Sequence, residues 1–520
     1  MNKQGSIVLI ALIVALGGFL MGFDASVISG VNKFIELEFG LTTLQLGWAV
    51  GSLTLTSTLA MLVAGPLSDR YGRKKILSLA AILYAVSAIS SALAPTFTLL
   101  VIARMIGGLG VGASLIIAPM YIAEISPAKI RGQMVSVNQL NIVIGISAAY
   151  FSNYLILQLA ESPEGWAQTL QFGEYEWRWM LGLETIPALI YFLALFLVPS
   201  SPRWLMMKKQ FDEALEIMTR TVGQGAQKEF DAIRNSLTQG EKRTDSSNVS
   251  DLFKSAMRLV LTVGIVIAVL QQITGINSVF FYAPMIFEQS GIGEDASFTQ
   301  AIYVGLINLV FTILAMSLID RLGRKPLLTI GLAGIAVFMF LLAYGFNSAT
   351  YTLNSEAVAS LAESVSADKL TPLVGQTFDS DVAYKGALQE ALGDDYAANE
   401  SALISSAISM DPMLILIGIL GFVASFAISI GPVMWVLFSE LFPNAIRGVA
   451  ISFVGLINSG ISFLVQLVFP WELANFGNSL TFLIYGIFAA VGFFFVLAMV
   501  PETRGKSLEE LEATLVKKSE

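Results

Sequence analysis

The chain has 520 residues, of which 55% are hydrophobic and only 13% are charged, and its formal net charge is −9. A soluble protein of this length needs more charged surface, so the composition predicts a membrane protein and excludes an ordinary soluble enzyme. The sequence contains neither Cys nor His, which excludes disulfides, thiol chemistry and the usual soft-metal ligands. We therefore expect no metal site and no cofactor. The lack of a basic face excludes a nucleic-acid partner.

Twelve stretches of mostly apolar residues follow one another along the chain. Each has the length of about 20 residues that a helix needs to cross ~30 Å of hydrocarbon, so the lipid bilayer is an expected partner. The first follows only Met1 to Ser6 and is too long for the core of a signal peptide, so we expect it to be retained. The predicted spans lie near residues 7–29, 44–66, 76–94, 97–121, 131–155, 179–199, 257–286, 298–319, 326–346, 412–438, 446–470 and 478–500.

Basic residues gather in the short loops after the second and the eighth spans. These residues are Arg70, Arg73, Lys74, Lys75, Arg321, Arg324 and Lys325. Because short loops rich in Lys and Arg stay in the cytoplasm, both termini are predicted to be cytoplasmic, and the loops 30–43 and 156–178 to lie outside. The predicted location is a cell membrane, the bacterial inner membrane, which the chain crosses many times.

The segment after the sixth span has mixed charge and helix-forming stretches, and it separates two halves. We predict an N-terminal six-helix bundle at 1–199, a cytoplasmic helical linker at 200–254, a C-terminal six-helix bundle at 255–500 and a cytoplasmic tail at 501–520.

Two pairs of similar loops relate the halves to each other. AEISPAKIRG at 123–132 and SELFPNAIRG at 439–448 share Glu, Pro and Arg-Gly at an offset of 316 residues. GPLSDRYGRK at 65–74 and MSLIDRLGRK at 316–325 are a second pair, at an offset of 251. This duplication predicts an all-α membrane protein with twelve transmembrane helices in two pseudo-symmetric bundles, the architecture of many transporters.

The larger offset of the later pair indicates an insertion in the second half. The Ala- and Ser-rich, acidic segment at about 348–410, between the ninth and tenth spans, is the place for it. We predict a solvated cap of short helices outside the membrane, with a substrate-capturing or partner-binding role as the alternative.

Three ionisable residues lie inside the spans, namely Asp24 in the first, Arg104 in the fourth and Glu184 in the sixth. A charge at the bilayer centre costs ~2.5–3.5 kcal/mol on insertion scales, so such residues are functional by default. We predict that Asp24 and Arg104 form an ion pair that protonation of Asp24 breaks, so that these residues couple transport to a proton. A purely structural ion pair is the alternative.

The spans also hold neutral hydrogen-bonding side chains together with aromatic rings. A sugar has hydroxyls in every direction and apolar C–H faces, so amides supply donors and acceptors while an indole covers a face. A single amide could instead join two helices. The predicted substrate-binding residues are Gln139, Gln271, Gln272, Asn277, Tyr282, Asn308, Trp435 and Asn458.

The duplicated loops place charged residues at the cytoplasmic end of each bundle. We expect Arg73 and Arg131 to gather around Glu124, and Arg324 and Arg447 around Glu440, because arginine and carboxylate pairs hold helix ends together. A role restricted to helix ends and topology is the alternative. With Asp69 and Asp320, these residues form the predicted cytoplasmic gate.

Further motifs make the family recognisable. They are SSPRWL at 200–205, QQITGIN at 271–277, PETRG at 501–505, GFDASVISG at 22–30 and GPVMWVLFSELFPNAIRG at 431–448. With the duplicated loops, they make the chain resemble the sugar porter family of the major facilitator superfamily over nearly its whole length. Within the family it is most similar to bacterial proton-xylose symporters and their glucose-transporting relatives.

The resemblance implies alternating access, with gate pairs that favour the outward-facing state. It implies that Asp24 stands where proton symporters have Asp and animal glucose facilitators have Asn, and that Arg104 and Glu184 match the xylose symporter. Six of the predicted substrate-binding residues fall on sugar-contacting positions, namely Gln139, Gln271, Gln272, Asn277, Trp435 and Asn458. Phe281 and Ser459 depart from the Tyr and Trp of close relatives, so we expect a wider, less polar pocket there.

The predicted function is proton-coupled symport of a monosaccharide, a pentose or a hexose, by a protein that works as a monomer and is not an enzyme. The alternatives are a facilitator without ion coupling, a polyol or inositol symporter, sodium coupling and a sugar sensor. Sodium coupling is disfavoured because no second carboxylate cluster accompanies Asp24.

Overall fold

The computed structural model describes residues 3–127, 130–221, 223–242, 249–361, 365–393, 395–443, 446–506 and 510–511. Within these residues, eleven helical segments are long and apolar enough to span a membrane, and the last is two helices that meet at Gly477. Twelve helical spans therefore agree with the prediction. Parts of the predicted linker (243–248) and tail (507–509 and 512–520) lie outside the described residues.

The chain divides into two compact units. Unit 1 comprises Met1–Val27, Ser52–Ser152 and Leu159–Ser247. Its core packs aliphatic side chains around the buried rings of Tyr84, Tyr121 and Tyr191. The elements that lie wholly or partly in unit 1 are α1 (Lys3–Phe39), α2 (Thr43–Tyr71), α3 (Arg73–Ala92), α4 (Phe97–Ile125), α5 (Arg131–Ala160), α6 (Gly165–Thr169), α7 (Glu176–Gly182), α8 (Thr185–Ala194), η1 (Leu195–Leu197), α9 (Pro202–Met207), α10 (Phe211–Thr221), η2 (Gly223–Gly225) and α11 (Ala226–Lys242).

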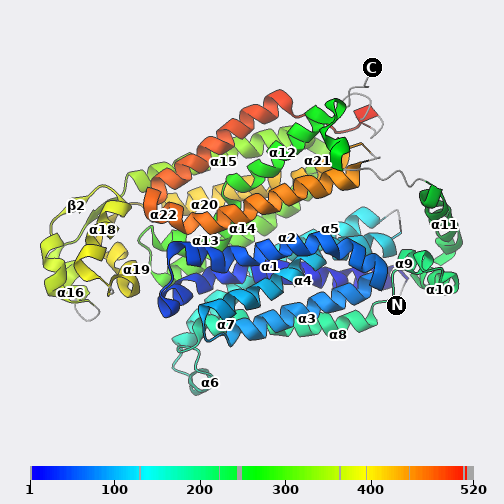
Figure 1. Cartoon of the computed structure of the whole chain (residues 1–520). Helices are drawn as coiled ribbons and strands as arrows, with labels where there is room; N and C mark the ends of the chain where they lie inside the picture. The colour runs from blue at the N-terminus through cyan, green and yellow to red at the C-terminus, as the bar shows by residue number, and fades with distance from the viewer. Residues whose placement is uncertain are drawn as a thin grey trace. The chain divides into compact units, whose positions relative to one another are not determined.

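Unit 2 comprises Asn248–Glu520 together with Ile28–Gly51 and Asn153–Gln158, which are end pieces of α1, α2 and α5. The remaining spans lie in it, and two of them are interrupted, as Figure 1 allows the reader to follow by label. Its elements outside the insert are η3 (Val249–Phe253), η4 (Ser255–Met257), α12 (Arg258–Ile273), α13 (Ile276–Glu288), α14 (Glu294–Leu322), α15 (Arg324–Asn347), α20 (Pro412–Ala427), α21 (Ile430–Leu441) and α22 (Arg447–Met499).

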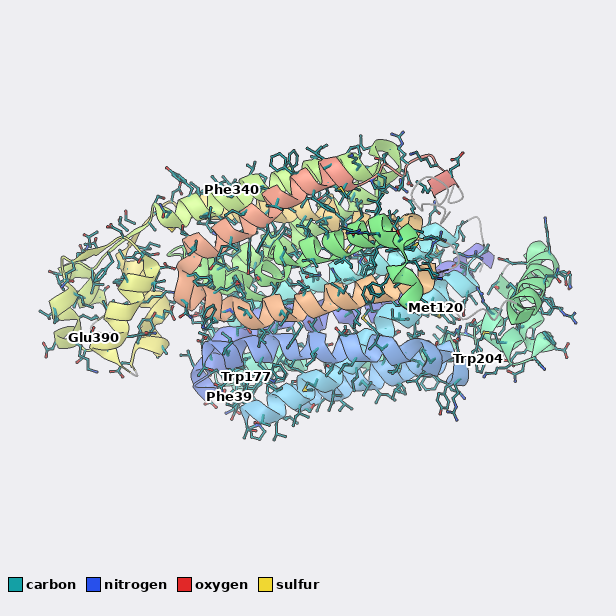
Figure 2. All side chains as sticks on the ribbon, turned by 45° about the horizontal axis from the view of Figure 1, so that its top comes forward. Phe39, Met120, Trp177, Trp204, Phe340 and Glu390 are labelled. Carbon is teal, nitrogen blue, oxygen red and sulfur yellow. The ribbon has the colours of Figure 1, made fainter. Side chains whose placement is uncertain are left out.

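The predicted insert folds as a compact body at one end of α15. It contains a three-stranded antiparallel sheet in the order β2–β1–β3, in which Tyr351 of the central strand pairs with Phe378 and Ile408. Four short helices cover the sheet, and the stacked rings of Tyr351 and Tyr384 lie in a core of their own. Glu390, labelled in Figure 2, marks this body, while Phe340 marks α15. The elements are β1 (Thr350–Thr352), α16 (Ser355–Ser360), α17 (Ala367–Leu370), η5 (Thr371–Leu373), β2 (Thr377–Phe378), α18 (Asp381–Leu392), α19 (Asp395–Ala407) and β3 (Ile408–Ser409).

The structure corrects the sequence prediction at two places. The prediction of short helices in the insert missed the sheet, because strands of two or three residues leave no alternating pattern to read. The predicted loop 30–43 is mostly helix, since α1 continues to Phe39. Val31 and Ile35 in this stretch are fully buried at helical spacing, and the helix ends where Gly40 adopts φ +58°.

Candidate functional site

Two spans of unit 2 are broken in their middle. α12 stops at Ile273 and α13 starts at Ile276, with Gly275 at φ +90° between them. A Cβ at Gly275 would lie 2.4 Å from the ring of Tyr485, so this break requires glycine for space as well as for conformation. α20 and α21 are also separated, at Ile428 and Ser429, where Ser429 leaves helical geometry with φ −128° and ψ −105°. Broken helices expose backbone groups at membrane depth, where transporters place their substrate sites.

A network of neutral amides lies beside these breaks. Gln271 Nε2 points to the carbonyl oxygens of Ile430 and Gly431 at 3.4 and 3.3 Å, which joins α12 to the start of α21. Asn458 Nδ2 donates to Gln271 Oε1 at 2.7 Å, and Gln272 Nε2 donates to Asn458 Oδ1 at 3.2 Å. The three amides thus fix one another's orientation across α12 and α22.

The network continues through the start of α13. Asn277 Nδ2 donates to Gln272 Oε1 at 2.8 Å and to Ser462 Oγ at 2.6 Å. Gln466 Nε2 also donates to Ser462 Oγ, at 2.9 Å. Sequence reasoning missed Ser462 and Gln466, although they follow Asn458 at spacings of four residues on one face of α22 and could have been found by that period.

The other predicted substrate residues of unit 2 lie apart from the hydrogen bonds given for this network. Tyr282 is fully buried, and its hydroxyl donates to the backbone carbonyl oxygen of Gln466 at 3.0 Å. It therefore contacts a residue of the network without binding its amide. Asn308 is buried on α14. Trp435 on α21 is 42% exposed, and its ring packs edge-on against Phe438. Gln139 belongs to unit 1, where its side chain is exposed on α5.

Unit 1 holds a second, charged cluster. Arg104 Nη1 and Asp24 Oδ1 are 3.5 Å apart, and each side chain is only 2% exposed. Glu184, at the junction of α7 and α8, is also buried and interacts electrostatically with both. Among the described residues, Asp24 Oδ2 and Glu184 Oε1 have no hydrogen-bond partner. One cation therefore faces two acids out of contact with water, and this burial costs less when one of the acids carries a proton.

Gly107 makes the space for this cluster, which the sequence did not reveal. A Cβ at this position would lie 2.5 Å from Ser87 Oγ and 2.8 Å from Asp24 Oδ2. Any side chain here would displace Asp24 or Ser87. The signal that could have found it is its place on α4, three residues and so nearly one turn after Arg104.

Charged groups join helix ends in both units, at the loops between α2 and α3 and between α14 and α15. In unit 1, Arg73 makes a bidentate pair with Glu124, with Nε–Oε2 and Nη2–Oε1 distances of 3.0 Å, and a pair with Asp69 at 2.6 Å. In unit 2, Arg324 makes the corresponding pairs with Glu440 at 3.0 and 2.6 Å and with Asp320 at 3.1 Å. We call these two groups the arginine latches.

Two of the predicted gate residues have other partners. Arg131 pairs with Glu229 of α11 at 3.3 Å and donates to Ser126 O, so it ties α5 to the linker. Arg447 Nε donates to Phe442 O at 3.1 Å. Two hydroxyl groups contact the latch acids, since Ser201 donates a hydrogen bond to Glu124 and Thr503 donates one to Glu440. These two residues come from the SSPRWL and PETRG motifs, which explains why the motifs stand where they do.

The family model described as sugar (and other) transporter matches residues 10–365 and 397–515. The chain belongs to this family. It is a multi-pass membrane transporter and not an enzyme, and its fold is the twelve-helix fold of the major facilitator superfamily.

Individual relatives match along nearly their full length. The chain is 35% identical to the arabinose-proton symporter of Bacillus subtilis, covering 99% of this chain and 96% of the relative. It is 33% identical to the D-xylose-proton symporter of Escherichia coli, covering 97% of this chain and 94% of the relative. An inward-open structure of the E. coli xylose transporter superposes with a TM-score of 0.75 at 32% identity, over 98% of this chain and 100% of the other.

Proposed function

We propose that this protein is a proton-coupled symporter of a monosaccharide, a pentose or a hexose, which works by alternating access. The observation that carries the proposal is the buried pair of Asp24 and Arg104, with Glu184 beside it, in a transporter whose other unit holds a neutral amide network. Relatives named as arabinose-proton and D-xylose-proton symporters support the same class of substrate and the same coupling ion.

The charged cluster supplies the proton step. When Asp24 is ionised, its Oδ1 holds the guanidinium of Arg104 against α1, while Oδ2 has no hydrogen-bond partner among the described residues and is available to a proton. Protonation removes the charge from Asp24, so Arg104 loses its attraction to α1 and turns to Glu184. The packing of α1 on α4 therefore depends on whether a proton is bound, which is what coupling requires.

The amide network supplies the sugar step. Gln271, Gln272 and Asn458 lie 5–7% exposed at the helix breaks, and each offers both a donor and an acceptor. A sugar hydroxyl exchanges hydrogen bonds with such groups at little cost, whereas a charged substrate would find no counter-charge in the network. The exposed indole of Trp435 is suited to an apolar sugar face.

We assign the arginine latches to the cytoplasmic side, because the loops that carry them also hold Arg70, Lys75 and Arg321. Both termini are then cytoplasmic, the insert is outside, and the protein lies in a cell membrane. On this assignment the latches hold the helix ends together while the transporter is closed to the cytoplasm.

The test is uptake of labelled xylose, arabinose, glucose and galactose into proteoliposomes, with and without an inward proton gradient. For one proton per sugar, a gradient of two pH units drives at most about 100-fold accumulation, since each unit is worth ~1.4 kcal/mol. We expect accumulation by the wild type. Asp24→Asn should lose accumulation and keep sugar exchange.

Glu390→Gln is the matched control, because Glu390 is an exposed carboxylate on α18, far along the chain from the charged cluster. It should accumulate sugar like the wild type. Equilibration without accumulation in the wild type, matched by Asp24→Asn, would identify a facilitator. If no sugar moves, the substrate class is wrong.

A further inference from the structure

The last turns of α1 belong to unit 2 and are held to the rest of that unit by polar contacts. Asn32 Nδ2 donates to Phe281 O at 2.8 Å. Lys33 Nζ lies 3.0 Å from Glu294 and 3.4 Å from Glu288, so one cation bridges the end of α13 and the start of α14. These contacts agree with the division of the chain, in which residues 28–51 belong to unit 2.

Charged residues of the insert also belong to this network. Glu36 of α1 interacts electrostatically with Glu400 of α19 and Lys385 of α18. Lys385 and Glu400 form an ion pair at 3.1 Å, and Gln289 Nε2 points to Glu400 Oε1 at 3.4 Å. One helix end, the α13–α14 turn and the insert thus share a single charged network.

The network has more acids than bases. In the described part of the chain, four carboxylates, those of Glu36, Glu288, Glu294 and Glu400, face two ammonium groups, those of Lys33 and Lys385. Each lysine therefore holds more than one acid, and removal of either lysine leaves like charges facing each other. Because Lys33 is 33% exposed and Glu400 is 31% exposed, water can reach these pairs, and they can break and re-form.

The insert itself is fastened to a different part of unit 2. Asp381, the first residue of α18, accepts hydrogen bonds from the backbone and side-chain nitrogens of Asn478 at 3.0 and 2.7 Å. Gly477, at the turn within α22, leaves the room that this contact needs, since a Cβ there would lie 2.5 Å from Asp381 Oδ1. The insert is thus anchored on α22, and among the described residues the charged network connects it to α1.

We propose that the insert is the fixed arm of a second latch, which holds the end of α1 on the side of the transporter opposite the arginine latches. In this outer latch, Lys33, Glu36, Lys385 and Glu400 must separate once in every transport cycle, while the insert stays on α22. The inference rests on the proposed function, because only a transporter that works by alternating access has to open on that side.

Crosslinking tests which contact has to break. The chain has no Cys, so introduced cysteines are the only reactive thiols. Glu36→Cys with Glu400→Cys links α1 to the insert through a short bifunctional thiosulfonate reagent. Asp381→Cys with Asn478→Cys links the insert to α22 and is the matched control. Sugar exchange is measured before linking, after linking and after reduction.

The first link should abolish exchange and reduction should restore it, whereas the control link should leave exchange unchanged. If neither link affects exchange, or if both abolish it, the outer latch is overturned while the proposed function stands. If the unlinked pairs and the wild type all fail to exchange any sugar, the proposed function fails first.

A charge variant gives a second readout that does not depend on linking. Ile35→Cys places a thiol on α1 where the native side chain is fully buried. In intact cells, Lys385→Met should raise its labelling by a membrane-impermeant thiol reagent about tenfold, a typical size for coupling between sites. Lys369→Met is the control, because Lys369 pairs with Asp395 within the insert and is 44% exposed. Equal labelling in the two variants would contradict the latch.

Discussion

The two polar clusters of this transporter differ in the kind of group that they bury. Unit 1 buries one arginine with two acids, and at least two of the acid oxygens have no hydrogen-bond partner among the described residues. Unit 2 buries amides whose donors are largely satisfied by one another. A charged cluster responds to a proton, and a neutral one does not. On the proposed function, this difference means that the two units have separate tasks, with unit 1 sensing the proton and unit 2 holding the sugar.

The largest effect is expected where a charge is left without its partner. Arg104→Met leaves Asp24 and Glu184 buried with no cation, and losing one member of a buried ion pair typically costs ~3–5 kcal/mol. We expect a marked loss of folded protein in the membrane and a lower unfolding temperature in detergent. The measurement is thermal unfolding followed by fluorescence-detected size exclusion.

The double variant Arg104→Met/Asp24→Asn is the control, because it removes one of the two uncompensated carboxylates and keeps similar side-chain volumes. It should be more stable than the single variant. If Arg104→Met unfolds at the same temperature as the wild type, Arg104 does not stabilise the buried acids of unit 1.

The amide network should fail in a different manner. Asn458→Leu removes a donor to Gln271 and an acceptor for Gln272, which costs about 1–3 kcal/mol for the groups left unpaired. We expect sugar affinity to fall about 5- to 150-fold, with the pH dependence of exchange unchanged. Isothermal titration and exchange at several pH values measure the two quantities. A shifted pH profile would break the proposed division of tasks.

The two arginine latches offer a comparison between equivalent places in the two units. Arg73 and Glu124 are 4% and 8% exposed, whereas Arg324 and Glu440 are 10% and 20% exposed. Burial strengthens a hydrogen-bonded ion pair against its broken state, so Arg73→Gln should have the larger effect. Thiol accessibility at the latch side is expected to rise in both variants, by about tenfold for the stronger latch. The reverse order would show that exposure does not set latch strength.

The smallest effect concerns pH at the insert. Burial acts to raise the pKa of Glu400, but the charge of Lys385 and hydrogen bonds from Lys385 and Gln289 outweigh it and hold this pKa below its usual value of 4.5. A carboxyl whose pKa is lowered stabilises the folded form above its usual pKa and loses that contribution as the pH falls through the lowered value. The contribution of Glu400 to docking of the insert should thus be constant from about pH 8 to pH 5 and be lost below that.

Hydrogen exchange of α19, followed by mass spectrometry and corrected for the intrinsic pH dependence, measures this docking. Lys385→Met should move the loss of protection to a higher pH, because the main attraction on Glu400 is gone. Loss of protection near pH 7 in the wild type would disagree with the environment of Glu400.

Much of the architecture could be predicted because it rests on repeated, local signals. Apolar runs gave the spans, and the offset between duplicated loops located the insert. Asp24 and Arg104 stood out because charge is rare in a span, and the structure places them within 3.5 Å. Gln271, Gln272 and Asn277 were grouped by their spacing, and they meet at a helix break.

The rest depends on contacts between distant segments, which no local pattern records. The partner of Arg131 is Glu229 on α11, almost a hundred residues away along the chain. The spacing of residues in the sequence could not reveal this pair. From the sequence, Lys385 is predicted to be a solvated residue of the insert. Only the folded structure shows that it pairs with Glu400 and interacts with Glu36. The helical structure of residues 30–39 was also missed, because polar residues such as Lys33, which suggested a loop, form contacts with α13 and α14.

Because α1 is uninterrupted from Lys3 to Phe39, it can transmit a movement from one of its ends to the other. Asp24 and Glu36 are on the same helix, twelve residues apart, and at 1.5 Å per residue they are separated by about 18 Å of stiff rod. The spans formed by α12–α13 and α20–α21 can bend at their breaks. Because α1 has no such break, a change in the tilt of one of its ends also moves the other end. On the proposed coupling and topology, a fluorophore placed on α18 beside Lys385 should therefore report on the ionisation of Asp24 from outside the membrane, so the insert is a suitable place for a sensor of the proton gradient.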